Sequence, residues 1–299
     1  MNPKDRHGFQ NTVLDWYKKN KREFLWRRET PEPFLTLVSE VMLQQTQTAR
    51  VEEKLPIFFE QFPTIFALAE ANNADIIRAW KGMGYNNRAL RLRDAARAIC
   101  ELHNGLIPRT LDELLSLPGI GRYTATALMS FSFKIDIPVV DVNIRRVYSR
   151  VFFKMETTSS VAPEKEIHEI AESIYPRNLS SYWHQAIMDI GAIFCTARQP
   201  DCKNCPLNDS CISSGKMIEY TAPKRAEPSY NGIPRRIWRG RTVELLRNTH
   251  ELTSESINVS LFGELATDAD HEWLQQVLSG LEKDGIIQWD GNVIQLREH

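Results

Sequence analysis

The chain has 299 residues, of which 42% are hydrophobic and 25% are charged, so it is long enough for two domains with a buried core. Its 37 Lys and Arg residues balance its 38 Asp and Glu residues, which neither marks nor excludes a nucleic-acid-binding protein. The first residues, MNPKDRHGFQ, lack the apolar core of a secretory signal. No apolar run reaches the roughly 18 residues that would span a bilayer. We therefore expect a cytoplasmic protein that does not enter a membrane.

Most of the first 220 residues is predicted to be helical, because apolar residues recur at the spacing of one helix face. Strand-like alternation is scarce in this region. Helix breaks are expected at Pro63, in GMGYNN (82–87) and in NGLIP (104–108). The clearest helical segments are 51–62, 73–83, 87–103 and 111–117.

The composition changes after the helical region. Residues 213–234 are polar and rich in proline and glycine, which predicts a linker. Beyond it, amphipathic patterns at 239–248 and 271–287 predict helices, and Asp290-Gly291 between two alternating segments predicts a hairpin. Helices followed by a short hairpin indicate a small winged-helix module. The arginine-rich stretch RRIWRGR at its start is expected either to contact phosphate or to end the linker.

Four of the five cysteines lie close together in CTARQPDCKNCPLNDSC. In a reducing compartment such a set binds a metal more often than it forms disulfides. Four thiolates suit either tetrahedral zinc or an iron–sulfur cluster, and ligand type alone does not separate the two. The cysteines, spaced C-x6-C-x2-C-x5-C, are Cys195, Cys202, Cys205 and Cys211.

The stretch LPGIGRYTA places Gly119 and Gly121 directly before a helical segment. Glycine allows a backbone to approach another group closely, and the N–H groups that begin a helix carry partial positive charge. Together with LDELLSL before it and YTATALMSF after it, the stretch predicts a helix–hairpin–helix that binds a phosphate oxygen. Two glycines alone would equally suit a plain helical hairpin.

Two acidic residues lie in apolar surroundings. Asp141 lies between IPVV and VNIRRV, where burial would raise its pKa unless N–H groups or positive charges compensate. A helix beginning near Asn143 could supply those N–H groups, although an N-cap role alone would also explain Asp141. Glu40 lies on an otherwise apolar helix, beside Val41 and Met42. A solvent-exposed glutamate is the simpler explanation there, but its neighbours indicate burial.

Taken together, SEVMLQQT, GMGY, LPGIGRYTA, VVDVNIRRV and the cysteine spacing resemble the iron–sulfur helix–hairpin–helix DNA glycosylases of the endonuclease III-like superfamily. Among these, the chain looks most like the MutY-type adenine glycosylases, over about residues 10–215. The resemblance implies a mainly α fold with a [4Fe–4S] loop. The expected domains are a glycosylase region at 1–212, the linker at 213–234 and a winged-helix-like module at 235–299. Within the glycosylase region, we expect a six-helix barrel at about 27–134 and an iron–sulfur cluster subdomain formed by 1–26 and 135–212.

The same resemblance implies roles for individual residues. Asp141 matches the acid shared by the superfamily, and Glu40 matches the MutY-type catalytic glutamate. Tyr123 stands where lyase-active relatives carry a catalytic lysine, and Asn143 falls on an active-site position. The four cysteines would bind a [4Fe–4S] cluster. The residues expected to contact DNA or the extruded base are Arg22, Leu43, Gln45, Thr46, Met83, Tyr85, Gly119 and Gly121.

The implied activity is base excision repair of double-stranded DNA that contains a mismatch or lesion, by a monomer associated with the nucleoid. The enzyme would hydrolyse the N-glycosidic bond of a flipped-out adenine opposite 8-oxoguanine or guanine. Glu40 would protonate the purine, and ionised Asp141 would stabilise the cationic sugar. Without a lysine at Tyr123, no amine is ready for a Schiff base, so the glycosylase would be monofunctional.

The chain departs from the family pattern in several places. Asn86 replaces an aromatic residue in GMGYNN, Val142 replaces a glycine in DVNI, and REFLWR lacks the proline of the corresponding family motif. Residues 235–299 are too short for the domain that reads 8-oxoguanine in many MutY-type enzymes. These departures leave a thymine or uracil glycosylase acting on G mismatches as an alternative. A non-catalytic DNA-binding protein is a second alternative.

Overall fold

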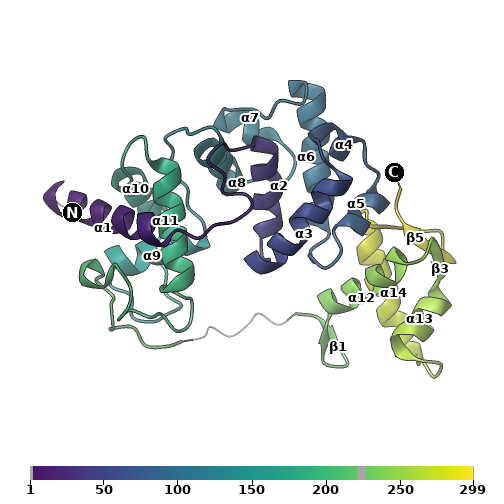
Figure 1. The fold of residues 1–299 in the computed structure, drawn as a ribbon. Helices are drawn as coiled ribbons and strands as arrows, with labels where there is room; N and C mark the ends of the chain where they lie inside the picture. The colour runs from purple at the N-terminus through teal and green to yellow at the C-terminus, as the bar shows by residue number, and fades with distance from the viewer. Residues whose placement is uncertain (1–2, 221–226, 299) are drawn as a thin grey trace. The chain divides into compact units, whose positions relative to one another are not determined.

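A computed structural model describes residues 3–220 and 227–298, and shows a mainly helical chain with two small sheets near its C-terminal end (Figure 1). The chain forms two compact units. Unit 1 comprises Met1–Leu37, Arg109–Ser116 and Ile120–Lys224, and unit 2 comprises Val38–Pro108, Leu117–Gly119 and Arg225–His299.

Unit 1 is a helical assembly around one apolar core. The core is formed mainly by α1, α9, α10 and α11, and Trp183 and Tyr148 lie fully buried at its centre. The indole Nε1 of Trp183 donates to Oη of Tyr148 at 2.8 Å, so both polar atoms are paired inside the core. The elements are α1 (Pro3–Asn20), α7 (Leu111–Ser116), α8 (Arg122–Ala127), the π-helical turn η1 (Leu128–Ser132), α9 (Val142–Phe152), α10 (Glu164–Ile174), α11 (Ser180–Ile193) and the short η2 (Asn208–Ser210).

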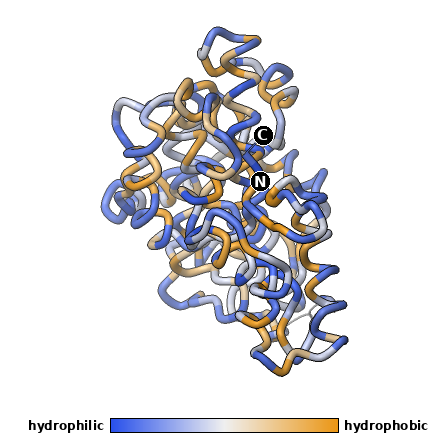
Figure 2. The backbone as a smooth tube through the Cα atoms, turned by 90° about the vertical axis from the view of Figure 1, so that its right-hand side faces the viewer, coloured by the Kyte–Doolittle hydropathy of each residue, from blue (hydrophilic) through white to orange (hydrophobic). Residues whose placement is uncertain are grey.

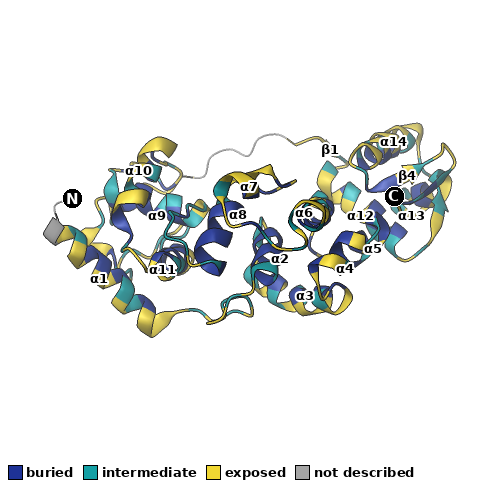
Figure 3. Cartoon of the chain, turned by 90° about the horizontal axis from the view of Figure 1, so that it is seen from above, coloured by how far each residue is buried: buried dark blue, intermediate teal, exposed yellow. Residues whose placement is uncertain are grey.

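Unit 2 contains most of α2 and the four helices that follow it. The predicted helices at 51–62 and 87–103 are confirmed, and each buries an apolar face; Figure 3 shows α6 with buried and exposed residues on different sides. The predicted helix at 73–83 ends earlier, at Ala79, because Gly82 and Gly84 take positive φ values and turn the chain. These elements are α2 (Pro33–Leu43), α3 (Thr48–Gln61), α4 (Ile65–Glu70), α5 (Asn73–Ala79) and α6 (Asn87–His103).

The C-terminal part of unit 2 has the predicted arrangement of helices and a hairpin. Its three strands are antiparallel in the order β3-β5-β4, and Trp289 pairs with Ile294 across the turn. In that turn Oδ1 of Asp290 accepts the N–H groups of Asn292 at 3.0 Å and Val293 at 2.9 Å. The elements are α12 (Arg235–Arg247), β3 (Glu251–Thr253), α13 (Ser254–Phe262), α14 (Asp268–Lys283), β4 (Ile287–Trp289) and β5 (Val293–Leu296).

The segment expected to be a linker, 213–234, is structured at both of its ends. Before residues 221–226, which lie outside the described residues, Tyr220 accepts a hydrogen bond from Oγ1 of Thr158 at 3.1 Å in unit 1. After them, β1 (Ser229–Tyr230) and β2 (Ile233–Pro234) pair as a short hairpin beside α12. Hydrogen-bonded structure is therefore present at both ends of the segment expected to be a linker.

Hydrophobic and hydrophilic residues alternate along the chain in Figure 2, as amphipathic helices require. Within residues 3–220 and 227–298, no helix combines the length and apolarity needed to cross a bilayer.

The structure gives different reasons for a glycine at each of the two positions of the predicted hairpin. Gly119 has φ +73°, and a Cβ there would lie 2.7 Å from Cβ of Arg91. Gly121 is the N-cap of α8 with an ordinary φ of −89°, and a Cβ there would meet nothing within 4 Å. Gly119 is thus required by the fold, whereas Gly121 leaves the start of α8 uncovered.

We expect Gly119→Ala to lower the free energy of unfolding by roughly 1–2 kcal/mol or more, because alanine resists a left-handed backbone and Arg91 must move. Gly121→Ala, the matched control, should cost under about 1 kcal/mol. Urea unfolding of both variants measures the difference, and equal losses would contradict this explanation.

Candidate active site

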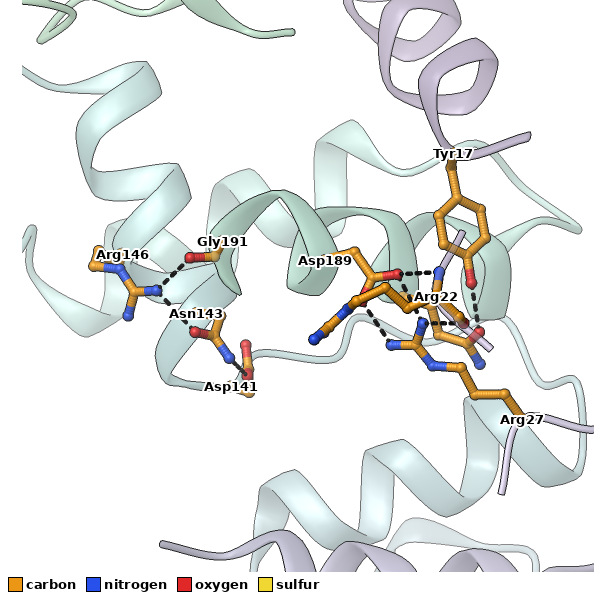
Figure 4. Close-up of polar contacts among 9 residues, drawn as sticks. Tyr17, Arg22, Arg27, Asp141, Asn143, Arg146, Asp189 and Gly191 are labelled. Carbon is orange, nitrogen blue, oxygen red and sulfur yellow. Dashed lines mark hydrogen bonds and ion pairs between the residues drawn. The ribbon is translucent and has the colours of Figure 1, made fainter. Parts of the chain in front are cut away.

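Asp141 is held at the start of α9 by groups of its own helix. It is the N-cap residue, and its Oδ1 accepts the N–H of Ile144 at 2.6 Å. Its Oδ2 accepts Nδ2 of Asn143 at 2.8 Å (Figure 4). The predicted N-cap role is therefore confirmed, and the second oxygen is hydrogen-bonded as well. Both oxygens are fixed in direction by donors within three residues.

Opposing effects act on the pKa of Asp141. Burial raises the pKa above its ordinary value, and this effect is the largest. Three groups lower it: the N–H of Ile144, the side-chain and backbone N–H groups of Asn143, and the positive charge of Arg146. The net direction is upward, so this carboxylate is less stabilised by the protein than an exposed one is by water. A cation that forms next to it would relieve that imbalance.

Arg146 connects Asp141 to the loop that carries the cysteines. Its Nη2 donates to Oδ1 of Asn143 and to the carbonyl of Gly191, each at 2.8 Å (Figure 4). Its Nε donates to the carbonyl of Cys195 at 2.6 Å. Because Asn143 gives its amide protons to Asp141 and its oxygen to Arg146, the orientation of the amide is determined. The position of Asp141 thus depends on the backbone at Cys195.

His184 holds the segment that leads into Asp141. Burial lowers the pKa of this histidine to about 4, so it is neutral. Its Nε2 accepts the N–H of Val139 at 3.1 Å, and its Nδ1 lies 2.7 Å from the carbonyl of Ser180. A neutral ring with one donor and one acceptor nitrogen satisfies both contacts.

A second polar network joins the chain before α2 to α11. Asp189 is fully buried, and its carboxylate pairs with Arg22 at 2.6 Å and Arg27 at 2.8 Å (Figure 4). Arg22 was predicted as a DNA-contacting residue; its side chain remains 30% exposed. Sequence reasoning missed Arg27 and Asp189. The signal for Asp189 was present, because it is a lone acid inside the apolar stretch AIMDIGAI.

Tyr123 lies in the first turn of α8 and packs, partly buried, against the core of unit 1. One side of its ring therefore packs against apolar side chains. Its polar group is a phenol, whereas lyase-active relatives carry an amine at this position.

The four predicted cysteine ligands line one small cavity of unit 1. Apolar side chains, including Val151 and Phe194, complete the lining. Burial raises the pKa of Cys205 to about 12 and raises that of Cys211, so a positive centre is needed to stabilise their thiolates. Among the described residues, no group of three or more His, Cys, Asp or Glu side chains is placed to hold a metal ion.

Arg150 ties the cysteine loop to α9. Its side chain is buried, and it donates to the carbonyls of Thr196 and Thr158 at 2.7 Å each and to Sγ of Cys195 at 3.4 Å. A buried guanidinium beside a sulfur atom favours negative charge on that sulfur.

In unit 2, Glu40 lies on α2 and is only 5% exposed, so the prediction that it is not a surface residue is confirmed. Leu43 ends the helix half-buried, and Gln45 follows in the left-handed region, with φ 57° and an exposed side chain.

Arg88 holds together the two turns that carry the predicted base-contacting residues. It donates to the carbonyl of Met42 at the end of α2, to that of Gln44 just after the helix, and to Oγ1 of Thr46 at 3.0 Å. It also donates to the carbonyl of Met83 at 3.0 Å. Burial lowers the pKa of Arg88 to about 10, which leaves it charged at neutral pH. Sequence reasoning missed Arg88, because it looks like a polar residue of an amphipathic helix.

The turn between α5 and α6 presents one predicted residue and hides another. Tyr85 is 53% exposed and has φ 46°. Met83 is only 4% exposed, so its side chain belongs to the core of unit 2 and its backbone to the turn. Any contact of Met83 with DNA would therefore require the side chain to move.

Residues 38–190 match the family of HhH-GPD superfamily base excision DNA repair proteins. The chain belongs to this family. It is similar to the adenine DNA glycosylase of Mycobacterium tuberculosis, with 36% identity over 242 residues, which cover 81% of this chain and 79% of the relative. It is 34% identical to the adenine DNA glycosylase of Mycolicibacterium smegmatis over 92% of this chain and 91% of the relative.

A solved thermostable thymine-DNA glycosylase has a similar fold, with a TM-score of 0.63 and 29% identity, over 70% of this chain and 95% of that one. The predicted family, helix–hairpin–helix fold and enzyme class, a DNA N-glycosylase, are thus confirmed.

We expect Asn143→Ala to shift the pH dependence of base release. The Asn143 amide lowers the pKa of Asp141, so its loss raises that pKa further, and the acid limb of the rate profile moves to higher pH. Single-turnover rates across pH measure the limb independently of the maximum rate. Val142→Ala is the matched control, because Val142 is 75% exposed. A limb that stays in place or moves to lower pH would contradict the proposed effect on Asp141.

Proposed function

We propose that the chain is a monofunctional glycosylase that removes adenine opposite 8-oxoguanine or guanine in double-stranded DNA, by hydrolysis of the N-glycosidic bond. The observation that carries this proposal is Asp141, a carboxylate held by oriented donors yet destabilised by burial. Pure binding of DNA needs no such group. The similarity to two adenine DNA glycosylases over more than two thirds of the chain supports adenine as the base.

The chemistry divides between two acids. The bond to be broken cannot be reached in a stacked duplex, so the base must be extruded, which costs less for a mismatched pair. Glu40 protonates the purine ring, which makes adenine a better leaving group. Positive charge then develops on the sugar, and ionised Asp141 stabilises it. Water completes the hydrolysis, and Tyr123 offers no amine for a lyase step.

Duplex DNA is the proposed partner of a monomeric enzyme inside the cell, associated with the nucleoid. The exposed backbone at Gly121 suits the approach of a phosphate oxygen, since the start of α8 carries partial positive charge. The part-exposed Arg22 supplies a further positive group, kept in place by Asp189. Exposed Gln45 and Tyr85 are the proposed contacts to the base stack, with Leu43 and Thr46 beside them.

We propose that Cys195, Cys202, Cys205 and Cys211 bind a [4Fe–4S] cluster. The chemistry of the residues suits such a group, because all four cysteines line one apolar cavity and Arg150 lies beside the Cys195 sulfur; the thiols would move closer together to bind it. When bound, the cluster would supply no step of the hydrolysis. It would fix the loop whose Cys195 carbonyl receives Arg146, and through Asn143 the orientation of Asp141.

Removal of thymine or uracil from G mismatches is the second candidate, because a thymine-DNA glycosylase shares the fold. We favour adenine, since the adenine glycosylases match more of the chain at higher identity.

We expect Asp141→Asn to retain mismatch binding and to lose nearly all adenine release, because the amide cannot stabilise a cation. Glu40→Gln should also lose adenine release, because an amide cannot protonate the base. Single-turnover excision, with binding measured on a non-cleavable duplex, separates the two effects. Adenine release by either variant at a rate near that of the unaltered enzyme would refute its assigned role.

Cys205→Ser should lose the brown iron–sulfur absorbance, and iron analysis should fall from four atoms per chain as the cluster requires. DNA binding should weaken with it, because the loop is no longer fixed. A preparation of the unaltered chain with about one zinc and no iron would overturn the cluster assignment.

A further inference from the structure

The C-terminal module contacts α5 and the turn that presents Tyr85, and Arg247 at the end of α12 makes two of the hydrogen bonds. Its Nε donates to the carbonyl of Ile77 at 3.0 Å, and its Nη2 donates to Oδ1 of Asn86 at 3.1 Å. Its third partner, Glu244, is 2.9 Å away and also pairs with Lys81 at 2.6 Å. The Arg247 side chain is only 8% exposed. A carbonyl of α5 and two residues of the turn, Lys81 and Asn86, are therefore joined to one helix of the module.

The turn needs such support, because three of its backbone positions are left-handed. Gly82, Gly84 and Tyr85 have φ values of 81°, 67° and 46°. For Tyr85, a residue with a Cβ, this conformation is unfavourable unless the surroundings impose it. Trp80 supports the turn from inside, since its Nε1 donates to the carbonyl of Gly84 at 3.0 Å, and Arg88 donates to the same carbonyl at 3.1 Å.

The side chain of Asn86 does not form the hydrogen bond that is usual at its position. It is the N-cap of α6, where an asparagine side chain ordinarily accepts an N–H group of its own helix. Here its side chain makes no capping bond, and its oxygen accepts Arg247 instead. The hydrogen bond that would stabilise α6 locally is exchanged for one that joins the turn to the module.

The arginines at the start of the module have other partners. Arg235 donates to the carbonyl of Gln276, Arg236 pairs with Glu227 at 3.4 Å, and Arg239 pairs with Asp284. If RRIWRGR contacts phosphate as expected, its arginines must therefore exchange contacts inside the module for contacts with phosphate. This applies above all to Arg235 and Arg239. Arg247 also pairs inside the module, with Glu244, but its Nε and Nη2 donate to Ile77 and Asn86 outside it.

We propose that Arg247 is a positioning residue, through which the C-terminal module holds the 80–86 turn in the conformation that presents Tyr85 to DNA. The proposal rests on the proposed function only in that this turn contacts DNA. It assigns the module a part in substrate binding that needs no contact between the module and DNA.

The test is a double-mutant cycle in the full-length chain with Arg247→Ala, Asn86→Ala and both together. Hydrogen exchange of the peptide covering 80–88, without DNA, should be faster in each single variant, and the two effects should not add. Asn86→Ala leaves the module untouched, so the test survives if Arg247→Ala fails to fold. Arg239→Ala is the matched control: it removes an ion pair from the same helix and should leave exchange in the turn unchanged.

In the same variants, the affinity for DNA should change and the rate of base release should not. The concentration of mismatched duplex at half-saturation should rise about tenfold, as expected for one lost charge-assisted hydrogen bond. The single-turnover rate at saturation should change little, and the salt dependence of binding should keep its slope, because no phosphate contact is lost.

Unchanged exchange in the turn would overturn the proposal, as would faster exchange with unchanged half-saturation. A salt slope reduced by about one unit would overturn it too, since Arg247 would then be a phosphate contact. Failure of the unaltered enzyme to release adenine would refute the proposed function instead, and the exchange cycle would still report on the contact between Arg247 and Asn86.

Discussion

The site in unit 1 depends on one electrostatic constraint: a carboxylate must stay ionised where burial opposes its charge. Asp141 meets this constraint with donors from its own helix, and the upward direction of its pKa shows that they compensate only in part. A fully compensated carboxylate would gain little from a neighbouring cation. A carboxylate that is only partly compensated is stabilised more when a cation forms beside it. Because this stabilisation is larger in the transition state than in the ground state, it lowers the activation barrier. The contacts of Asn143 and Arg146 serve to keep that balance.

Partly or fully buried arginines donate to the segments on which the proposed functional groups lie. Arg146 and Arg150 donate to carbonyls of the cysteine loop, Arg88 to carbonyls of two turns in unit 2, and Arg247 to the carbonyl of Ile77 near the end of α5. Such turns have few backbone partners of their own, because they belong to neither a helix nor a sheet. A guanidinium, with five donors in one plane, can satisfy several of these carbonyls at once.

Local features of the fold could be predicted from the sequence, and long-range partners could not. Apolar spacing located α3 and α6, and the Asp141 pattern located the start of α9, because the cause of each lies within a few residues. The partners of Asp189 are more than 160 residues away, so the sequence showed a lone acid without its arginines. Met83, which was expected to contact DNA, is buried between two glycines with positive φ, and nothing in the sequence indicated that burial. Arg247 looked like an ordinary last-turn residue.

The central claim, that this chain is an adenine glycosylase, is tested most directly by single-turnover excision on four duplexes that differ in one pair. The pairs are adenine opposite 8-oxoguanine, adenine opposite guanine, thymine opposite guanine and uracil opposite guanine. We predict release of adenine from the first two and an intact backbone at the resulting abasic site, since no lysine stands at the Tyr123 position. Preferential release of thymine or uracil would contradict the account.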